Sequence, residues 1–134
     1  MRHDVFNKLT LFGFLALVLV ACSSDAAQTT VNDLPSGDAA RGAALFTQAI
    51  NGTPACETCH NTTTVKNVGP GLEGLGTRAA DRVEGESAGD YLYNSITRPS
   101  RFLVSGFSNL MYNDYVNQLQ PQQIADLIAY LLTL

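Results

Sequence analysis

The sequence of 134 residues lacks tryptophan and is poor in charge, in histidine and in methionine. Only 15% of its residues are charged and the formal net charge is −4, so a basic surface for nucleic acid is not expected. No apolar run reaches the roughly 20 residues that a membrane-spanning helix needs. Hydrophobic residues nevertheless make up 46% of the chain, enough for a packed core. Length and composition therefore predict a single globular domain.

The first 21 residues form a segment of their own. Arg2 and Lys8 precede an apolar stretch at 9–21 that is too short to span a bilayer as a helix. A basic start, a short apolar stretch and a small residue at its end are typical of a secretory signal peptide, here residues 1–21. An uncleaved anchor or a buried core helix is the alternative interpretation.

The end of this segment, LVAC at 19–22, resembles the cleavage box of bacterial lipoproteins. The resemblance implies that Cys22 becomes the first mature residue and receives the lipid, and more than one acyl chain gives stable anchoring. An ordinary exported protein with an incidental cysteine is the alternative. Residues 22–36 are small and polar without periodicity, so they predict a flexible tether to a domain at 37–134.

Helical periodicity appears in three stretches, at 37–52, 87–97 and 120–134. The second opens with the spacing of a capping box and is closed by a proline, and the third carries isoleucine and leucine at i, i+3, i+4 and i+7. Residues 53–88 and 98–118 are aperiodic and predict loops. Without any β-type alternation, the prediction is an all-α fold with long loops. The core would be small for the chain length, so a large apolar cofactor is expected to complete it.

The stretch CETCH, residues 56–60, carries the reactive side chains of this domain. Once residues 1–21 are removed and Cys22 is assigned to the lipid, it holds all remaining cysteines and the remaining histidine. The mature chain keeps one methionine, Met111, and a net charge of −5 from eleven acidic and six basic residues. Metal or redox chemistry is therefore expected to centre on CETCH.

Three chemistries compete for CETCH. A zinc site needs four ligands, commonly with a second cysteine or histidine pair, and the mature chain has no such pair. A thioredoxin-like redox pair needs a neighbouring βαβ pattern, which the sequence does not show. The third, C-x-x-C-H, is the attachment signature of haem c, in which each thiol bonds one vinyl group and the histidine faces the iron. Together with the export signal and the helical pattern, haem c is the prediction.

From residue 37 onward the sequence resembles the class I mono-haem c-type cytochromes of bacteria. A first helix, CETCH, the stretch GPGLEGLGTR at 69–78, a middle helix, a loop with one methionine and a last helix follow in the family's order. The resemblance implies a class I cytochrome c fold whose first and last helices cross beside one haem. The residues that match this crossing are Gly42, Phe46, Leu127 and Tyr130.

The resemblance also implies the roles of the residues around the haem. Cys56 and Cys59 would bind the haem covalently, and His60 would be the proximal iron ligand. The carbonyl of Pro70 would accept the Nδ1–H of His60, which raises the basicity of the ligand. Leu72 would pack on the haem face.

Met111, fifty-one residues after His60, corresponds to the distal iron ligand of the family. Tyr112 follows it where the family usually has a proline, so a less rigid loop is expected. A lone methionine that merely fills the core is the alternative. Arg78 is open between a hydrogen bond to a haem propionate and a solvated surface position.

A histidine and a methionine together fill both axial positions of the iron, and the thioether favours the ferrous state. This predicts an electron carrier rather than an enzyme, with one covalent haem c and redox proteins as partners. The lipid would hold it in the cell envelope on the outer face of a membrane, between respiratory or photosynthetic complexes, as a shuttle or a permanent subunit. The alternatives are a haem-based sensor or peroxidase-like enzyme in which Met111 is displaced, and a haem-bearing structural subunit.

Overall fold

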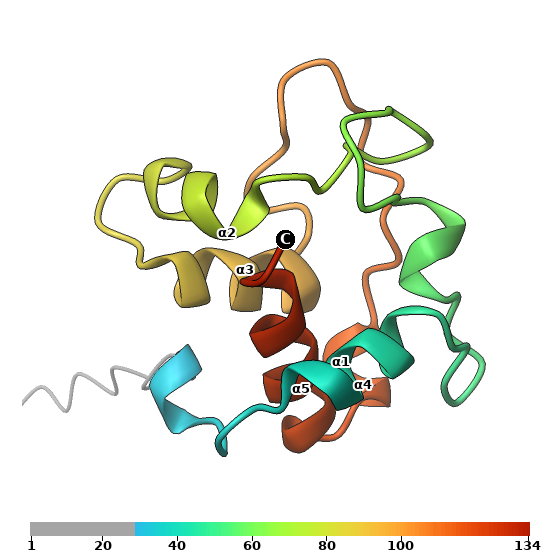
Figure 1. Ribbon diagram of the computed structural model, residues 1–134, viewed down its shortest axis with the longest axis vertical. Coiled ribbons are helices and arrows are strands. Elements are labelled where there is room, and N and C mark those ends of the chain that lie inside the picture. The colour runs from blue at the N-terminus through green and yellow to red at the C-terminus, as the bar shows by residue number, and fades with distance from the viewer. Residues whose placement is uncertain (1–28) are drawn as a thin grey trace, which may run out of the picture.

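The computed structural model describes residues 29–134, which contain helices and no strand. The helices are α1 (Ala39–Phe46), α2 (Leu75–Arg78), α3 (Ala88–Thr97), α4 (Tyr115–Gln118) and α5 (Pro121–Leu131), with 3-10 turns at Val31–Asp33, Cys56–Thr58 and Ala79–Asp81 (Figure 1). The expected signal peptide and Cys22 lie outside the described residues. Within the described part of the chain, none of the helices has the length and apolarity needed to cross a membrane. The all-α prediction is confirmed for residues 29–134.

Side-chain caps define where the longer helices begin. The carboxylate of Asp38 accepts a hydrogen bond from the backbone N–H of Arg41 at 2.8 Å before α1. The hydroxyl of Ser87 accepts one from the N–H of Asp90 at 3.1 Å before α3, and α5 begins with Pro121. These groups satisfy or remove N–H donors that the first helical turn leaves unpaired.

Helix α1 is shorter than the sequence predicts. It ends at Phe46 and does not continue to residue 52, because the backbone leaves the helical conformation at Thr47 (φ −96°, ψ 3°). The Thr47 hydroxyl donates to the carbonyl of Ala44 at 3.0 Å, which occupies an acceptor of the last turn.

Helices α1 and α5 cross at close range at Gly42, which is buried. A Cβ atom at this position would overlap the carbonyl oxygen of Asp126 and would lie 2.7 Å from Cβ of Tyr130. The ring of Phe46 packs edge-on against Tyr130 with 5.6 Å between the ring centroids, and Leu127 is buried beside them. The expected crossing is therefore present, and it depends on the absence of a side chain at Gly42.

Asp126 joins the same two helices through polar contacts. Its side chain is buried and accepts hydrogen bonds from Nε and Nη2 of Arg41 at 2.8 and 2.9 Å. It also accepts one from the N–H of Asp38 at 2.8 Å and one from the Gln122 amide at 2.9 Å. The Arg41 guanidinium lowers the pKa of this carboxyl to about 2. These hydrogen bonds to a buried carboxylate hold the N-terminal end of α1 against α5.

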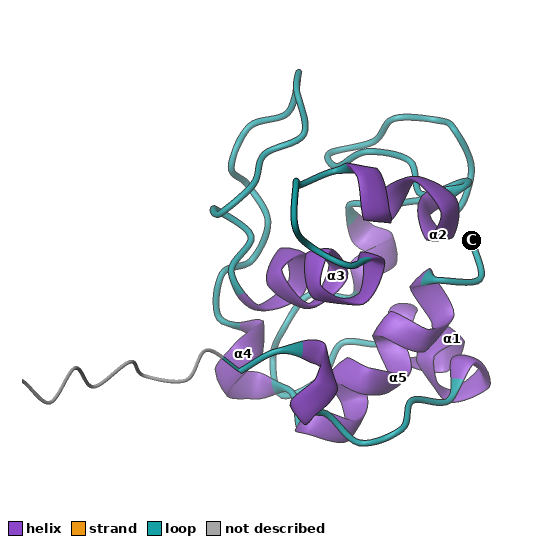
Figure 2. Ribbon diagram, turned by 90° about the vertical axis from the view of Figure 1, so that its left-hand side faces the viewer, coloured by secondary structure: helices purple, strands orange, loops and turns teal. Residues whose placement is uncertain are grey.

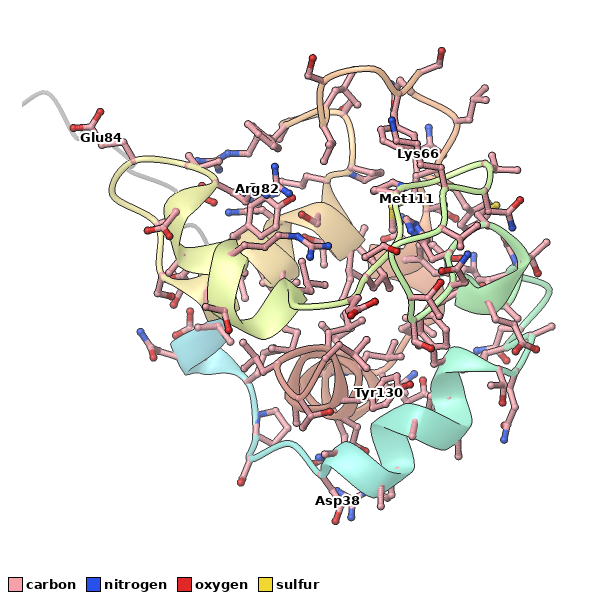
Figure 3. All side chains as sticks on the ribbon, turned by 45° about the horizontal axis from the view of Figure 1, so that its top comes forward. Asp38, Lys66, Arg82, Glu84, Met111 and Tyr130 are labelled. Atoms are coloured by element: carbon pink, nitrogen blue, oxygen red, sulfur yellow. The ribbon has the colours of Figure 1, made fainter. Side chains whose placement is uncertain are left out.

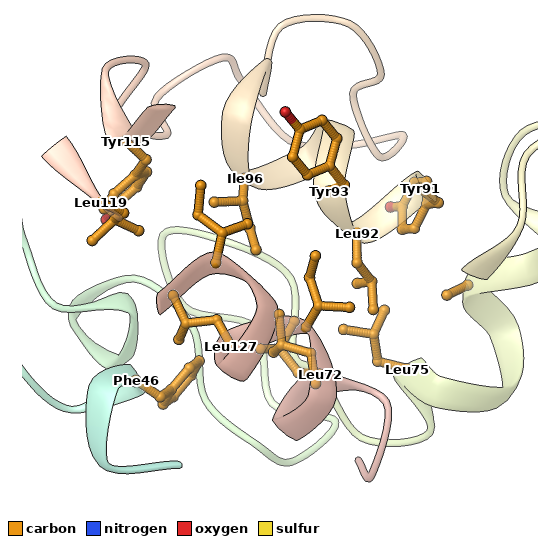
Figure 4. Close-up of a cluster of buried hydrophobic side chains, with 14 residues drawn as sticks. Phe46, Leu72, Leu75, Tyr91, Leu92, Tyr93, Ile96, Tyr115, Leu119 and Leu127 are labelled. Atoms are coloured by element: carbon orange, nitrogen blue, oxygen red, sulfur yellow. The ribbon is translucent and has the colours of Figure 1, made fainter. Parts of the chain in front are cut away.

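The hydrophobic core lies where α5 meets α1 and α3, and α2 contributes Leu75 from its contact with α3 (Figure 4). The buried side chains labelled there are Phe46, Leu72, Leu75, Tyr91, Leu92, Tyr93, Ile96, Tyr115, Leu119 and Leu127. A long loop, residues 98–114, extends from the end of α3 and returns to α4 (Figures 1 and 2).

Residues 31–33 lie inside the segment expected to be a tether, but they form a 3-10 turn on the N-terminal end of α3. The N–H of Val31 donates to the carboxylate of Asp90 at 3.2 Å, and its side chain faces Gly89. Defined structure therefore begins before residue 37, which was the expected domain boundary.

Candidate functional site

A hollow of about 1220 Å³, counting its open mouth, lies between the CETCH turn, helix α3 and the long loop. Its walls are mainly apolar side chains from α2, α3, α5 and loop 98–114. The site residues that the sequence predicts in the described region, namely Cys56, Cys59, His60, Pro70, Leu72, Arg78 and Met111, all line it.

The CETCH turn presents both thiols to this hollow. Residues 56–58 form a 3-10 turn, in which the N–H groups of Cys59 and His60 donate to the carbonyl of Cys56 at 3.1 and 3.0 Å. Both cysteines are free thiols. Burial raises the pKa of the Cys56 thiol to about 11. The turn thus brings two thiols and an imidazole to one wall.

The ring of His60 is held from behind by the backbone. Its Nδ1 lies 3.0 Å from the carbonyl oxygen of Pro70, the contact that the family resemblance implies. Because a carbonyl only accepts, Nδ1 carries the proton and Nε2 keeps its lone pair for a metal. The N–H of Gly69 donates to the carbonyl of Cys59 at 2.8 Å, and a Cβ at Gly69 would lie 2.7 Å from Nδ1 of His60. A glycine is therefore required at this position.

Met111 comes to the hollow from loop 98–114 and is partly buried, while Leu72 is buried and comes from the segment before α2. Figure 3 shows Met111 and Lys66 on the part of the domain that lies away from α1 and Asp38. The ammonium of Lys66 lies 5.7 Å from the centroid of the Phe107 ring, so it connects loop 61–70 to the long loop.

Two arginines line the hollow on the side of α2, and the sequence predicts only one of them. Arg78 donates through Nη2 to the carbonyl of Gly71 at 2.7 Å and through Nη1 to that of Glu73. The Nε–H groups of Arg78 and Arg82 are both buried without a protein acceptor (Figure 3 labels Arg82). A buried donor without a partner costs ~1–3 kcal/mol, so an anionic group in the hollow would stabilise both.

Arg82 is not among the site residues that the sequence predicts, although one sequence signal points to it. It lies four residues after Arg78, a spacing that puts two side chains on one face of a helix. The chain between them is helical, since α2 continues directly into the turn at Ala79–Asp81. Arg78 lines the hollow and is partly buried.

A cluster of three or more histidine, cysteine, aspartate or glutamate side chains able to hold a metal is absent from residues 29–134. The zinc interpretation therefore lacks its ligands within the described part of the chain. The ligand pair that faces this hollow is one imidazole and one thioether. That pair, beside two thiols three residues apart, is the donor set of a c-type haem iron.

The sequence model of the cytochrome c family matches residues 39–134. The chain belongs to the cytochrome c family. A comparison with curated protein sequences gives no match. Membership confirms the class I cytochrome c fold, a covalent haem c, of which one is typical of a domain this size, and haem-based electron transfer.

The residues of this cytochrome c domain fit its cofactor. Cys56 and Cys59 offer the two thiols, His60 offers Nε2 and Met111 offers its sulfur from one hollow. The unpartnered donors of the two arginines suit the carboxylates of the haem propionates. When bound, the haem supplies a one-electron iron couple.

Proposed function

We propose that this cytochrome c is a lipid-tethered electron carrier of the cell envelope and not an enzyme. The observation that carries the proposal is the composition of the hollow. Among its lining residues, His60 and Met111 are the metal-ligating pair, and neither a second histidine nor a carboxylate is present. Peroxide or hydrolytic chemistry needs a positioned acid or base, which these side chains do not supply. A six-coordinate iron on packed helices suits electron transfer.

The surrounding groups would tune the iron for this role. The hydrogen bond from His60 to Pro70 makes the imidazole a stronger electron-pair donor to the iron, which favours the ferric state. The thioether of Met111 favours ferrous iron. Arg78 and Arg82 would hold the propionates and add positive charge, which also favours ferrous iron. The balance of these groups would set the potential at which the protein accepts an electron.

Redox partners would dock over the mouth of the hollow. Val68, Leu103 and Leu110 all line it and keep 50, 46 and 69% of their surface exposed. The docking surface would include these residues together with Pro54 and Ala55. Because it is mostly uncharged, the electron-transfer rate should change only modestly with ionic strength. A steep fall of the rate with salt would instead indicate that the acidic residues steer a basic partner.

The tether and the location rest on the N-terminal sequence, outside the described residues. Cys22 would carry the lipid and hold the domain at the outer face of a membrane, where it would serve respiratory or photosynthetic complexes as a shuttle or a subunit. Wild-type protein should partition into detergent or membranes, and Cys22→Ser should be soluble or remain an uncleaved precursor. A fully soluble wild type with unmodified Cys22 would contradict this part of the proposal.

The axial role of Met111 is tested by spectroscopy. The oxidised protein should show the weak long-wavelength band of an iron–thioether bond. Met111→Ala should remove the band, lower the reduction potential and allow carbon monoxide to bind the ferrous iron, because the sixth position opens. Val65→Ala, a change at an exposed residue that does not line the hollow, should leave all three unchanged. Rapid carbon monoxide binding by the reduced wild type would refute the proposal and favour a sensor or enzyme.

A further inference from the structure

The side chains that tie the Met111 loop to the rest of the fold, Arg101, Phe102 and Phe107, all lie four or more residues before the methionine. The backbone hydrogen bonds of the loop are local, such as those from Phe107 to Val104 and from Leu110 to Ser108. Tyr112 follows the methionine, so the rigid ring of a proline is not available there. Some other part of the fold must position Met111 relative to the CETCH turn.

Helix α4 begins only four residues after Met111, and it is tied at both ends to the segment that precedes CETCH. At its first residue, the Tyr115 hydroxyl donates to the carbonyl of Pro54 at 2.8 Å. At its last residue, the carbonyl of Gln118 accepts from the side-chain amide of Asn51 at 2.8 Å. These hydrogen bonds join residues 61 and 67 positions apart in the chain. Pro54 itself lies two residues before Cys56.

The internal contacts of α4 make it a stiff connection. Tyr115 is 6% exposed and lines the hollow, and the Tyr112 ring packs edge-on against it with 5.0 Å between centroids. The carboxylate of Asp114 accepts from the Gln118 amide at 3.0 Å, which spans the helix. The chain that follows Met111 thus enters, within four residues, a helix that two long-range hydrogen bonds hold in place.

We propose that Tyr115 and Asn51 form a brace that positions Met111 over the CETCH turn and controls how readily its sulfur leaves the iron. The proposal rests on the proposed role of Met111 as an axial ligand. Only residues 112–114 separate the methionine from α4, and three residues give little slack for the sulfur to withdraw while α4 stays fixed. Tyr115 and Asn51 are positioning residues here, since neither contacts the iron.

The test uses the mature holoprotein with two variants that remove one hydrogen bond each. Tyr115→Phe keeps the packed ring and removes the hydroxyl. Asn51→Gly removes the amide at an exposed residue whose φ of 50° suits glycine. Tyr112→Phe is the control, because it removes a neighbouring hydroxyl and leaves the brace intact. The probe is imidazole, which competes with the thioether for ferric iron.

If the brace holds the sulfur, each brace variant should bind imidazole roughly two- to tenfold more tightly than wild type, the ratio expected for one hydrogen bond. The double variant should exceed either single one, and its ferrous form should bind carbon monoxide faster. The long-wavelength band should weaken in the same order. Tyr112→Phe should match the wild type in all three measurements.

The outcomes separate this proposal from the one on which it rests. If the wild type shows the band and all variants bind imidazole with equal affinity, the brace proposal is refuted and Met111 remains the ligand. An equal rise in Tyr112→Phe would also overturn it, because the effect would not depend on the hydroxyl of Tyr115. A wild type without the band would refute the axial role itself. If Tyr115→Phe fails to retain haem, Asn51→Gly alone decides.

Discussion

Gly69 lies directly behind the imidazole of His60, so Gly69→Ala measures how tightly the backbone holds the proximal ring. The added Cβ would lie 2.7 Å from Nδ1 and 2.9 Å from Nε2 of His60. Ordinary non-bonded contacts are ~3.5–4.0 Å, so the ring or the loop must move by about 1 Å. A movement of this size away from Gly69 disturbs the 3.0 Å contact of His60 with Pro70.

Two costs follow from that displacement. Overpacking in a tight site costs ~1–3 kcal/mol, and a lost hydrogen bond costs ~0.5–1.5 kcal/mol. The free energy of unfolding should therefore fall by about 2–4 kcal/mol. The weaker hydrogen bond also makes His60 a weaker electron-pair donor to the iron. Weaker donation disfavours ferric iron, so the reduction potential should rise.

Denaturant unfolding followed by the haem absorbance gives the first quantity, and spectroelectrochemical titration gives the second. Gly89→Ala is the matched control, because its Cβ would meet the Val31 side chain, at 3.1 and 3.2 Å from the two Cγ atoms, and not the His60 ring. The helical preference of alanine, roughly 0.5–1 kcal/mol, opposes the cost of this contact, so the stability should stay near that of the wild type and the potential should not change. A Gly69→Ala protein with wild-type stability and potential would show that the ring is not held by the backbone behind it.

Three further changes test the crossing and the arginines. Gly42→Ala should separate α1 from α5 and lower the unfolding free energy by ~1–3 kcal/mol or more. Denaturant unfolding should show this as a lower midpoint, with an unchanged dependence of the free energy on denaturant concentration. The pKa of Asp126 is about 2, below its ordinary 3.8, so its contribution is present above about pH 4 and is lost as the pH falls towards 2. Because Arg41 is 57% exposed, this contribution should be about 1–2 kcal/mol, and Asp126→Asn should remove that part of the acid dependence in unfolding measured from pH 5 to 2. Arg82→Gln removes a positive charge from the hollow, so the potential should fall and depend more on pH, and an unchanged potential would place Arg82 outside the site.

The elements that the sequence predicted are those encoded locally. The helices α1, α3 and α5 each carry a cap or proline signal next to a periodic apolar stretch, and such patterns need only neighbouring residues. The short helices α2 and α4 were assigned to loops because four residues are too few to show a period. The end of α1 at Phe46 was missed because a side-chain hydrogen bond of Thr47 closes the helix before the expected end at residue 52.

The sequence by itself indicated the cofactor, because the C-x-x-C-H spacing is that of haem c attachment and the mature chain lacks the second ligand pair that zinc needs. The resemblance to c-type cytochromes also implied which two helices cross, through Gly42, Phe46, Leu127 and Tyr130. The tertiary structure alone decided that Gly69 packs against His60 and that Tyr115 and Asn51 tie α4 to the segment before CETCH. These contacts are steric fits or hydrogen bonds between segments up to 67 residues apart, and only the packed chain brings such segments within reach of each other.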